Sequence, residues 1–400
     1  MKYALIIPDG AADEPQGTAG GVSPLEAART PAIDQIAQAG VVGRADHVPR
    51  ELQSGSDVGI MSLMGYDPLV GHTGRAPIEA VAQGIELNQH DWAIRCNLVT
   101  VSGGRMQNFT AGHVDNHVAQ ALIGHLQQDL DDDSPWQYYP GVSYRNLLVH
   151  RPRADAGKAM FSSATRSTPP HDLLDLPIRE HLPTGPGAAS LCELMDRSRE
   201  LFAGSDVDSQ ATQVWFWGLG PRPGLEPFVE RFGKTAAVVT AVDVVRGLGG
   251  LMGLTVIEVE GATGYLDTDY AAKGQAAIAA LHEHDLVVVH VEATDEASHD
   301  GNVAAKIEAL ERIDECIVGP IHDALVSLGD YRILVSPDHP TLLRTRTHAH
   351  GHVPIAACGT GLVADEHRRY DEVTASGSSL VFERGCELMP WFQGGLSGTA

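Results

Sequence analysis

Three short apolar segments that run directly into acidic residues or histidines place the strongest constraint on the fold of this chain. The segments are residues 3–8, 286–291 and 332–335, and the polar residues behind them are Asp9, then Glu292, Asp295 and His299, then Asp338 and His339. In an open α/β sheet, ligands bind beyond the carboxyl ends of the strands. The pattern therefore predicts a sheet whose strand ends supply carboxylates and imidazoles, as a polar metal-binding region requires.

Alternating strand-like and helical segments extend this sheet along the chain. From Val214 onward, strand-like segments are expected at residues 214–217, 236–242, 255–259, 286–291, 332–335 and 353–358. Helical segments lie between them, notably at 271–284 and 303–328, so these strands should form a mostly parallel sheet flanked by helices, to which segment 3–8 also belongs.

The length of 400 residues suggests two domains, because single hydrophobic cores stop growing at about 250–300 residues. We predict a discontinuous core made of residues 1–87 and 212–400. Residues 88–211 are then an inserted, smaller α+β domain.

Charge and cysteine usage narrow the class of protein. The net charge of −24 argues against nucleic acid or anionic membranes as partners. The five cysteines are widely spaced and contain no CxxC pair, which is typical of reduced thiols. Since no segment approaches the 18 or so apolar residues of a membrane span, we expect a cytoplasmic protein.

Ser56 is a candidate nucleophile because small and polar residues around it lead into an apolar helical run. Backbone N–H groups and the dipole at a helix start stabilise an anion, which would suit an ionised or phosphorylated serine. The same residues also form an ordinary helix N-cap, so this segment alone does not decide between the two interpretations.

Three arginines are candidate ligands for an anionic group. Arg75 lies in a glycine-flanked turn at a helix start, and Arg95 and Arg145 lie in strand-like segments. The alternatives are a solvated side chain for Arg75 and an internal carboxylate partner for Arg95.

The spacing of acidic residues and histidines favours two metal sites. Asp295 and His299 are four residues apart, so one helical turn can bring both to one ion, and His348 is the natural third ligand. Asp9, Asp338 and His339 would form a second set. Mixed carboxylate and imidazole ligands suit Mn²⁺, Zn²⁺ or Mg²⁺, and two such ions would clamp a phosphoryl group and activate Ser56.

Taken together, these motifs resemble the cofactor-independent phosphoglycerate mutases of archaeal type, within the alkaline phosphatase superfamily. The resemblance is closest to the bacterial branch often labelled homoserine kinase. It covers nearly the whole chain and rests on Pro8-Asp9-Gly10, Gly55-Ser56-Asp57, Gly74-Arg75-Ala76-Pro77, Arg95-Cys96-Asn97, Ser143-Tyr144-Arg145, Asp295-Glu296-Ala297, Pro337-Asp338-His339 and Arg346-Thr347-His348.

The resemblance implies an alkaline-phosphatase-like core and a glycolytic isomerase that interconverts 3-phosphoglycerate and 2-phosphoglycerate through phosphorylated Ser56. It implies no need for 2,3-bisphosphoglycerate. The inserted domain would close over a small phosphorylated hydroxy-acid substrate and keep water from the phosphoserine, with Arg95 and Arg145 among its substrate ligands.

The resemblance also implies two divalent metal ions, with Mn²⁺ expected and Mg²⁺ or Zn²⁺ as alternatives. Asp295, His299 and His348 would hold one ion, and the other would be held by Asp9, Asp338, His339 and the Ser56 oxygen. A homoserine kinase-like phosphotransferase and a metal-dependent phosphatase of the same superfamily are the alternative functions, because they would use the same machinery.

Overall fold

The computed structural model describes residues 1–153 and 160–394, which form two compact units. One unit contains Met1–His72 together with the chain from Gly224 onward, and the other contains Thr73–Pro223. The predicted insertion, residues 88–211, lies inside the second unit. This unit also includes a helix before residue 88 and the strand that follows residue 211.

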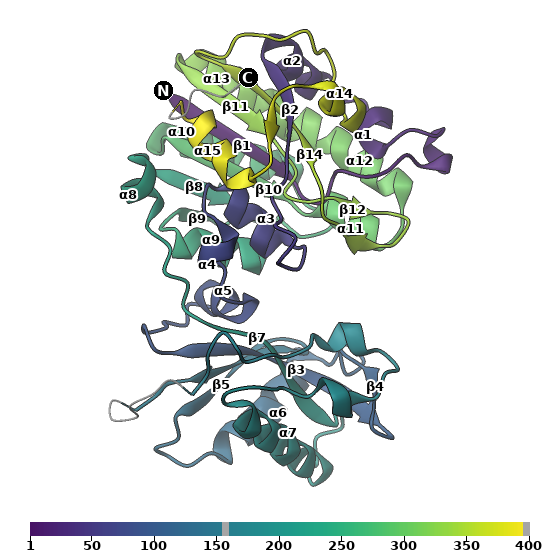
Figure 1. The fold of residues 1–400 in the computed structure, drawn as a ribbon, viewed down its shortest axis with the longest axis vertical. Helices are drawn as coiled ribbons and strands as arrows, with labels where there is room; N and C mark the ends of the chain where they lie inside the picture. Colours follow the sequence, from purple (N-terminus) through teal and green to yellow (C-terminus); the bar gives the residue numbers. More distant parts are fainter. Residues whose placement is uncertain (154–159, 395–400) are drawn as a thin grey trace. The chain divides into compact units, whose positions relative to one another are not determined.

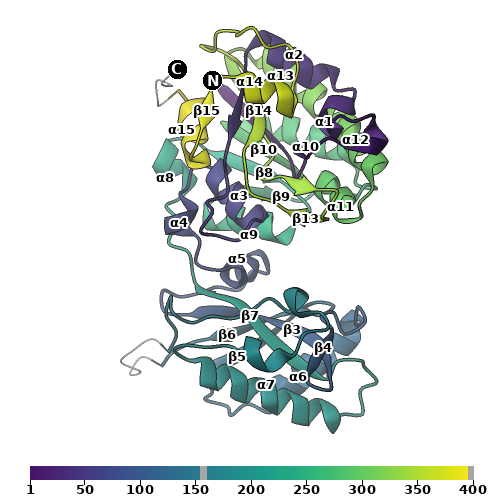
Figure 2. The same cartoon turned by 45° about the vertical axis from the view of Figure 1, so that its right-hand side comes forward.

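The first unit is built on an eight-stranded sheet in the order β15-β2-β14-β11-β1-β10-β8-β9. Its strands are β1 (Lys2–Pro8), β2 (Val41–Ala45), β8 (Ala236–Val239), β9 (Thr255–Ile257), β10 (Leu286–Val291), β11 (Tyr331–Val335), β14 (Val353–Gly359) and β15 (Val381–Phe382). All neighbouring strands are parallel except for β14, which runs antiparallel to β11 and to β2 (Figure 2). The predicted mostly parallel sheet is confirmed.

Helices cover both faces of this sheet, which explains why β1 and β10 are almost wholly apolar (Figure 1). The helices are α1 (Pro24–Ala27), α2 (Pro31–Ala39), α3 (Ser56–Leu63), α4 (Pro68–Gly71), α8 (Phe228–Phe232), α9 (Asp243–Leu251), α10 (Tyr270–Glu283), α11 (Ala293–His299), α12 (Val303–Ile313), α13 (Gly319–Leu328), α14 (Glu372–Gly377) and α15 (Leu388–Phe392). Ile6 of β1 packs in a buried cluster with side chains of α2, α10 and α13. Tyr3, on the opposite face of the strand, meets Phe392 of α15 with ring centroids 5.6 Å apart.

A π-helical turn and a two-stranded ribbon also belong to the first unit. A π-helical turn, Asp314–Val318, joins α12 to α13. A two-stranded ribbon of β12 (Thr341–Leu342) and β13 (Thr347–His348) follows β11. Over the described ranges 1–153 and 160–394, no helix is both long and apolar enough to cross a membrane.

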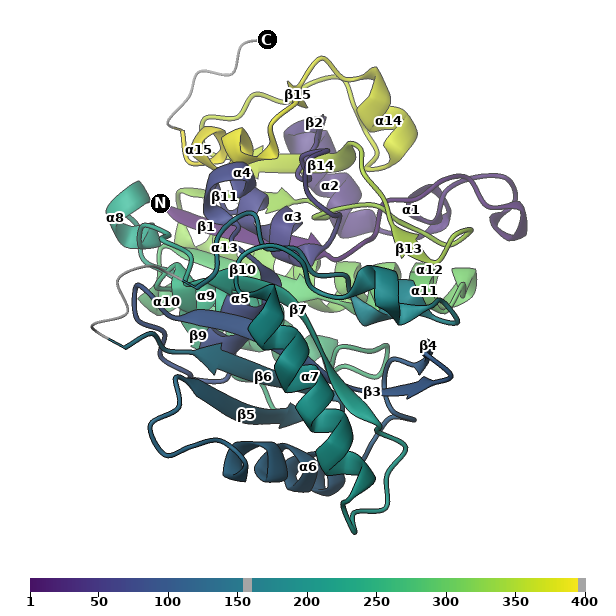
Figure 3. The same cartoon turned by 60° about the horizontal axis from the view of Figure 1, so that its bottom comes forward.

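The second unit is an antiparallel sheet with helices on both faces. Its strands are β3 (Trp92–Ser102), β4 (Arg105–Asn108), β5 (Trp136–Val142), β6 (Arg145–His150) and β7 (Gln213–Pro221). Helices α6 (Asn116–Gln128) and α7 (Ala188–Ala203) cover one face (Figure 3), and α5 (Arg75–Ala82) packs on the other.

The expectation that strand 214–217 belongs to the parallel core sheet is wrong. These residues lie in β7, which pairs antiparallel with β3 in the second unit. The segment is as apolar as the core strands, so its composition does not reveal a pairing partner that lies far earlier in the chain.

Candidate metal centre

The polar site lies at the carboxyl ends of three adjacent parallel strands, β11, β1 and β10. Asp9 directly follows β1, Asp295 lies in α11 directly after β10, and Asp338 and His339 follow β11. Asp9, Asp338 and His339 are buried. The structure thus brings the ends of the three predicted strands together.

The first group of possible metal ligands is Asp295, His299 and His348, whose ligand atoms all lie within 4.8 Å of one another. Asp295 Oδ2 is 3.1 Å from His299 Nε2, and the two side chains share one turn of α11 as their spacing predicts. His348 Nε2, from β13, is 3.1 Å from His299 Nε2.

Main-chain carbonyls orient both imidazoles of this group. His299 Nδ1 lies 2.9 Å from the carbonyl oxygen of Arg346, and His348 Nδ1 lies 3.1 Å from that of Ser54. Each Nδ1 can reach its carbonyl only as a donor, so Nε2 of both rings is available to a metal ion.

The second group contains Asp9, Asp338 and His339, with Ser56 beside it. Ser56 Oγ donates a hydrogen bond to Asp9 Oδ2 at 3.0 Å and lies 3.3 Å from His339 Nε2. Within the described part of the chain, Asp9 Oδ1 and Asp338 Oδ2 are buried without a hydrogen-bond partner. Buried carboxylate oxygens without partners are costly, and a divalent cation would satisfy both, so these residues fit a metal ion.

The shifted pKa values of the carboxyl groups also support the binding of a metal ion at this site. Burial raises the pKa of Asp9 well above its usual range, and the nearby charges of Asp338 and Asp295 raise it further. Burial also acts on Asp295, but hydrogen bonds from His299 and His348 hold its pKa well below the ordinary value. The interaction with Asp295 raises the pKa of His299 to about 9. Several carboxylates crowded in one buried site favour an added cation.

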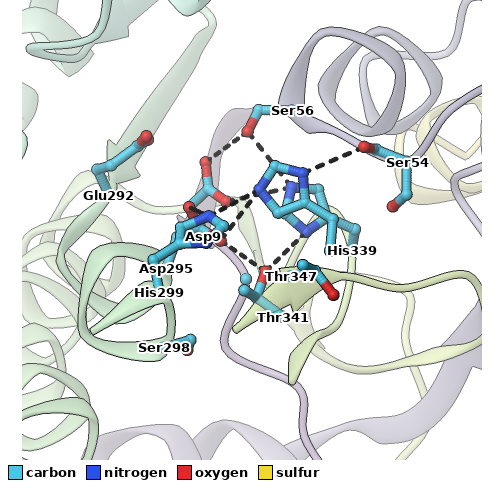
Figure 4. A network of polar contacts seen from close by, with 12 residues as sticks. Asp9, Ser54, Ser56, Glu292, Asp295, Ser298, His299, His339, Thr341 and Thr347 are labelled. Atoms are coloured by element: carbon cyan, nitrogen blue, oxygen red, sulfur yellow. Dashed lines mark hydrogen bonds and ion pairs between the residues drawn. The ribbon is translucent and has the colours of Figure 1, made fainter. Parts of the chain in front are cut away.

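Ser56 is the first residue of α3, and the N-cap position belongs to Gly55. Its hydroxyl points toward Asp9 instead of capping the helix (Figure 4). Gly59 of the same helix lets α3 approach the segment that follows β11. A Cβ atom at this position would lie 2.6 Å from the Asp338 carbonyl oxygen.

His290 and Glu292 also contact the site; Glu292 was expected only as one of the acidic residues behind its strand, and His290 was not predicted as a site residue. His290 Nε2 lies 2.7 Å from Asp9 Oδ2, and its Nδ1 lies 3.1 Å from Thr240 Oγ1. Asp9, His290 and Glu292 form a third group of possible ligands. A histidine inside a strand that is otherwise aliphatic was the signal that could have identified His290.

The three candidate arginines lie in the second unit. Arg95 is buried, its Nε lies 2.9 Å from Glu79 Oε2, and its guanidinium stacks 4.1 Å from the centroid of Trp217. It therefore has an internal carboxylate partner. Arg75 Nε bonds the other oxygen of Glu79 at 3.1 Å, and Arg145 is exposed beside Tyr144.

Comparisons with known proteins give a consistent result. Residues 37–208 match the family described as 2,3-bisphosphoglycerate-independent phosphoglycerate mutase. A protein of that name from Methanosarcina barkeri is 42% identical over 97% of this chain and 98% of its own length. The 2,3-bisphosphoglycerate-independent phosphoglycerate mutase 2 of Methanothermobacter thermautotrophicus is 43% identical over 95% of this chain and 94% of its own. The solved cofactor-independent phosphoglycerate mutase of Thermoplasma acidophilum has a similar fold, with a TM-score of 0.67 at 23% identity over 98% of this chain and 99% of that one.

Proposed function

The chain belongs to the 2,3-bisphosphoglycerate-independent phosphoglycerate mutases, and we propose that it interconverts 3-phosphoglycerate and 2-phosphoglycerate through a phosphoserine at Ser56. The observation that carries this proposal is the position of Ser56 Oγ. It lies at the start of α3, 3.0 Å from Asp9 Oδ2 and 3.3 Å from His339 Nε2. A nucleophile needs this proximity to groups that can take its proton or stabilise its ionised form.

We propose that two divalent ions bind here, one held by Asp295, His299 and His348 and the other by Asp9, Asp338, His339 and Ser56 Oγ. Mn²⁺ suits the mixed oxygen and nitrogen ligands, and Mg²⁺ or Zn²⁺ are alternatives. When bound, such ions neutralise phosphoryl oxygens and favour the ionised serine hydroxyl.

The chain's own residues would then carry the transfer. Ser56 Oγ passes its proton to Asp9 and forms a bond to phosphorus as the bond between phosphorus and the 3-oxygen of glycerate breaks, and the 3-oxygen then takes up that proton. The phosphoryl group afterwards leaves Ser56 for the 2-oxygen of the same glycerate, and the proton of the 2-hydroxyl group returns to Ser56 Oγ, so no external acceptor is needed. The amino end of α3 favours the added negative charge on Ser56.

We infer different roles for the three arginines of the second unit. Arg75 and Arg145 would bind carboxylate or phosphate oxygens of the substrate. Arg95 would act through Glu79, because its guanidinium is buried and already paired with that carboxylate. Glu79 also holds Arg75, so Arg95 would help to position Arg75. Substrate contacts from this unit would help to exclude water from the phosphoserine.

The decisive experiment compares Ser56→Ala with Ser54→Ala. Metal-stripped protein restored with Mn²⁺ is incubated with 3-phosphoglycerate, without 2,3-bisphosphoglycerate, while 2-phosphoglycerate and free phosphate are followed together. We expect 2-phosphoglycerate from the wild type and a loss of at least about 10³-fold in Ser56→Ala. Ser54→Ala is the matched control, because Ser54 Oγ bonds the Ala349 carbonyl instead of Asp9, and it should remain active.

Other outcomes would reassign the function. Release of free phosphate alone would indicate a phosphatase. Phosphate transfer from ATP to homoserine, with no reaction of 3-phosphoglycerate, would indicate the kinase-like alternative. Full mutase activity in Ser56→Ala would exclude the phosphoserine.

A further inference from the structure

Thr341 touches one member of each proposed ligand group through a single oxygen atom. Its Oγ1 lies 2.5 Å from Asp295 Oδ1 and 3.1 Å from His339 Nδ1 (Figure 4). The residue is completely buried. One hydroxyl therefore joins a ligand of one proposed metal ion to a ligand of the other.

The main chain fixes the place of this hydroxyl. Thr341 pairs with His348 in the β12–β13 ribbon, and its N–H donates to the Ala12 carbonyl at 3.2 Å. Its own carbonyl accepts a hydrogen bond of 2.9 Å from Lys306 Nζ, which is itself paired with Asp13 Oδ2 at 2.9 Å. Lys306 is fully buried, so this support is shielded from solvent.

The protons of this contact can be assigned by counting. A hydroxyl has one proton to donate and two lone pairs, and an ionised carboxylate can only accept. The Thr341 proton therefore goes to Asp295 Oδ1. The contact with His339 is then a hydrogen bond only if His339 Nδ1 carries a proton and donates it to Thr341 Oγ1.

This assignment leaves His339 Nε2 without a proton, facing the proposed second metal site. Nε2 lies 3.3 Å from Asp338 Oδ2 and 3.5 Å from Asp9 Oδ1, both of which are acceptors. A bare nitrogen facing two carboxylate oxygens is the arrangement that a cation between them would complete. At the first site, Thr341 donates its hydrogen bond to Asp295 Oδ1, and the other carboxylate oxygen, Oδ2, remains beside His299.

We propose that Thr341 is a positioning residue that prepares both metal sites at once. It selects the His339 tautomer whose Nε2 binds metal, and it orients the Asp295 carboxylate. The inference rests on the two-ion site of the proposed function and adds a coupling between its halves. Loss of one hydroxyl should weaken both ions together.

The test removes the hydroxyl while keeping the shape of the side chain. Metal-free Thr341→Val, Thr341→Ser and wild type are titrated with Mn²⁺, with binding followed by calorimetry and by the electron paramagnetic resonance of free Mn²⁺. We expect both dissociation constants to rise roughly 10- to 100-fold in Thr341→Val, as is usual for partners of metal ligands. Thr341→Ser should bind both ions nearly as tightly as the wild type.

Thr347→Val is the matched control. It makes the same change on the facing strand β13, where the Thr347 hydroxyl contacts Thr345 Oγ1 at 3.0 Å. Its Mn²⁺ affinities should equal those of the wild type.

The outcomes separate this inference from the proposed function. If the wild type binds two ions and Thr341→Val binds both unchanged, or loses only one, the coupling is wrong and the two-ion site stands. If the wild type does not bind two ions, the proposed site falls, and this inference falls with it.

A measurement on the wild type covers the case in which Thr341→Val does not fold. In Zn²⁺-loaded protein with ¹⁵N-labelled histidine, nuclear magnetic resonance should show His339 protonated at Nδ1. Protonation at Nε2 would overturn the proposal.

Discussion

The ionised form of Asp9 is costly in the folded protein for three reasons. Its carboxylate is fully buried, its Oδ1 has no hydrogen-bond partner among the described residues, and the charges of Asp338 and Asp295 lie nearby. A cation relieves all three costs in the folded protein, but not in the unfolded chain, where these side chains are solvated and apart.

We therefore expect Mn²⁺ to stabilise the fold. A free concentration of 100 times the dissociation constant should raise the free energy of unfolding by about 2.7 kcal/mol for one site. Thermal unfolding with and without Mn²⁺ measures this effect. Asp338→Asn should reduce it, and equal stabilisation of that variant would contradict the assignment of Asp338 as a ligand.

His47 predicts a dependence of stability on pH. Burial lowers the pKa of His47 to about 4, whereas an unfolded histidine titrates near 6.5. Between these values the unfolded chain binds a proton that the folded protein does not. The free energy of unfolding should therefore fall as pH falls through this window, by up to about 1.4 kcal/mol per pH unit from this residue.

His47→Gln isolates that contribution. Glutamine can still donate to Ser336 Oγ, which lies 3.1 Å from His47 Nε2, but it does not titrate. In urea unfolding between pH 7.5 and pH 5, the wild type should lose more stability than the variant. Parallel pH profiles would contradict the prediction.

At the scale of elements, the close packing of α3 against the segment after β11 sets the distance between Ser56 and Asp338. In Gly59→Ala, the added Cβ would lie 2.6 Å from the Asp338 carbonyl oxygen, so the helix must move. We expect reduced mutase activity and weaker Mn²⁺ binding, despite the higher helix propensity of alanine. Activity equal to that of the wild type would show that α3 can shift without effect.

Gly124 in α6 provides the opposite case. A Cβ atom there would meet nothing within 4 Å. Gly124→Ala should therefore stabilise the protein by up to about 1 kcal/mol, measured by urea unfolding, and leave activity unchanged. A loss of stability would show a constraint that the structure does not contain.

Strands were predictable from the sequence where their own residues form a recognisable pattern. β1, β10 and β11 are apolar runs that end in polar residues, so both the strands and the ligand candidates at their ends could be identified. β2, with Gly43 and Arg44 inside only five residues, and the two-residue β15 carry no such signal, because neighbours at the sheet edge define them.

The same distinction applies to the residues of the site. Ligand candidates are recognisable by residue type. The roles of Thr341 and Gly59 are not, because they depend on contacts with residues that are distant in the sequence or that only the fold brings into place. The pairing of Arg95 with Glu79 is similar, since the sequence left open whether the partner was a carboxylate or a ligand.

At the scale of the molecule, each unit has a hydrophobic core of its own. In the second unit, α6 and α7 share one cluster with the sheet, and α5 forms another with β3 and β6. Its two ends lie together, because Thr73 Oγ1 donates a hydrogen bond of 2.6 Å to the Pro221 carbonyl. Residues 73–223 thus have the features of an independently folding domain.

We expect the fragment 73–223 to fold alone, with a cooperative urea transition followed by circular dichroism. The fragment 88–211 is the matched control. It lacks α5 and β7, so it loses the α5 cluster and the strand beside β3, and it should be much less stable. An unfolded 73–223, or equal stability of the two fragments, would contradict these boundaries.

The meeting of these two ends also has an evolutionary consequence. A segment that leaves and rejoins its host at one point can be replaced as a whole by recombination, and none of the strand pairings of the eight-stranded sheet would change. Selection could then modify residues 73–223 for a new substrate while the carboxylates and imidazoles of the host remained under a separate and stricter constraint.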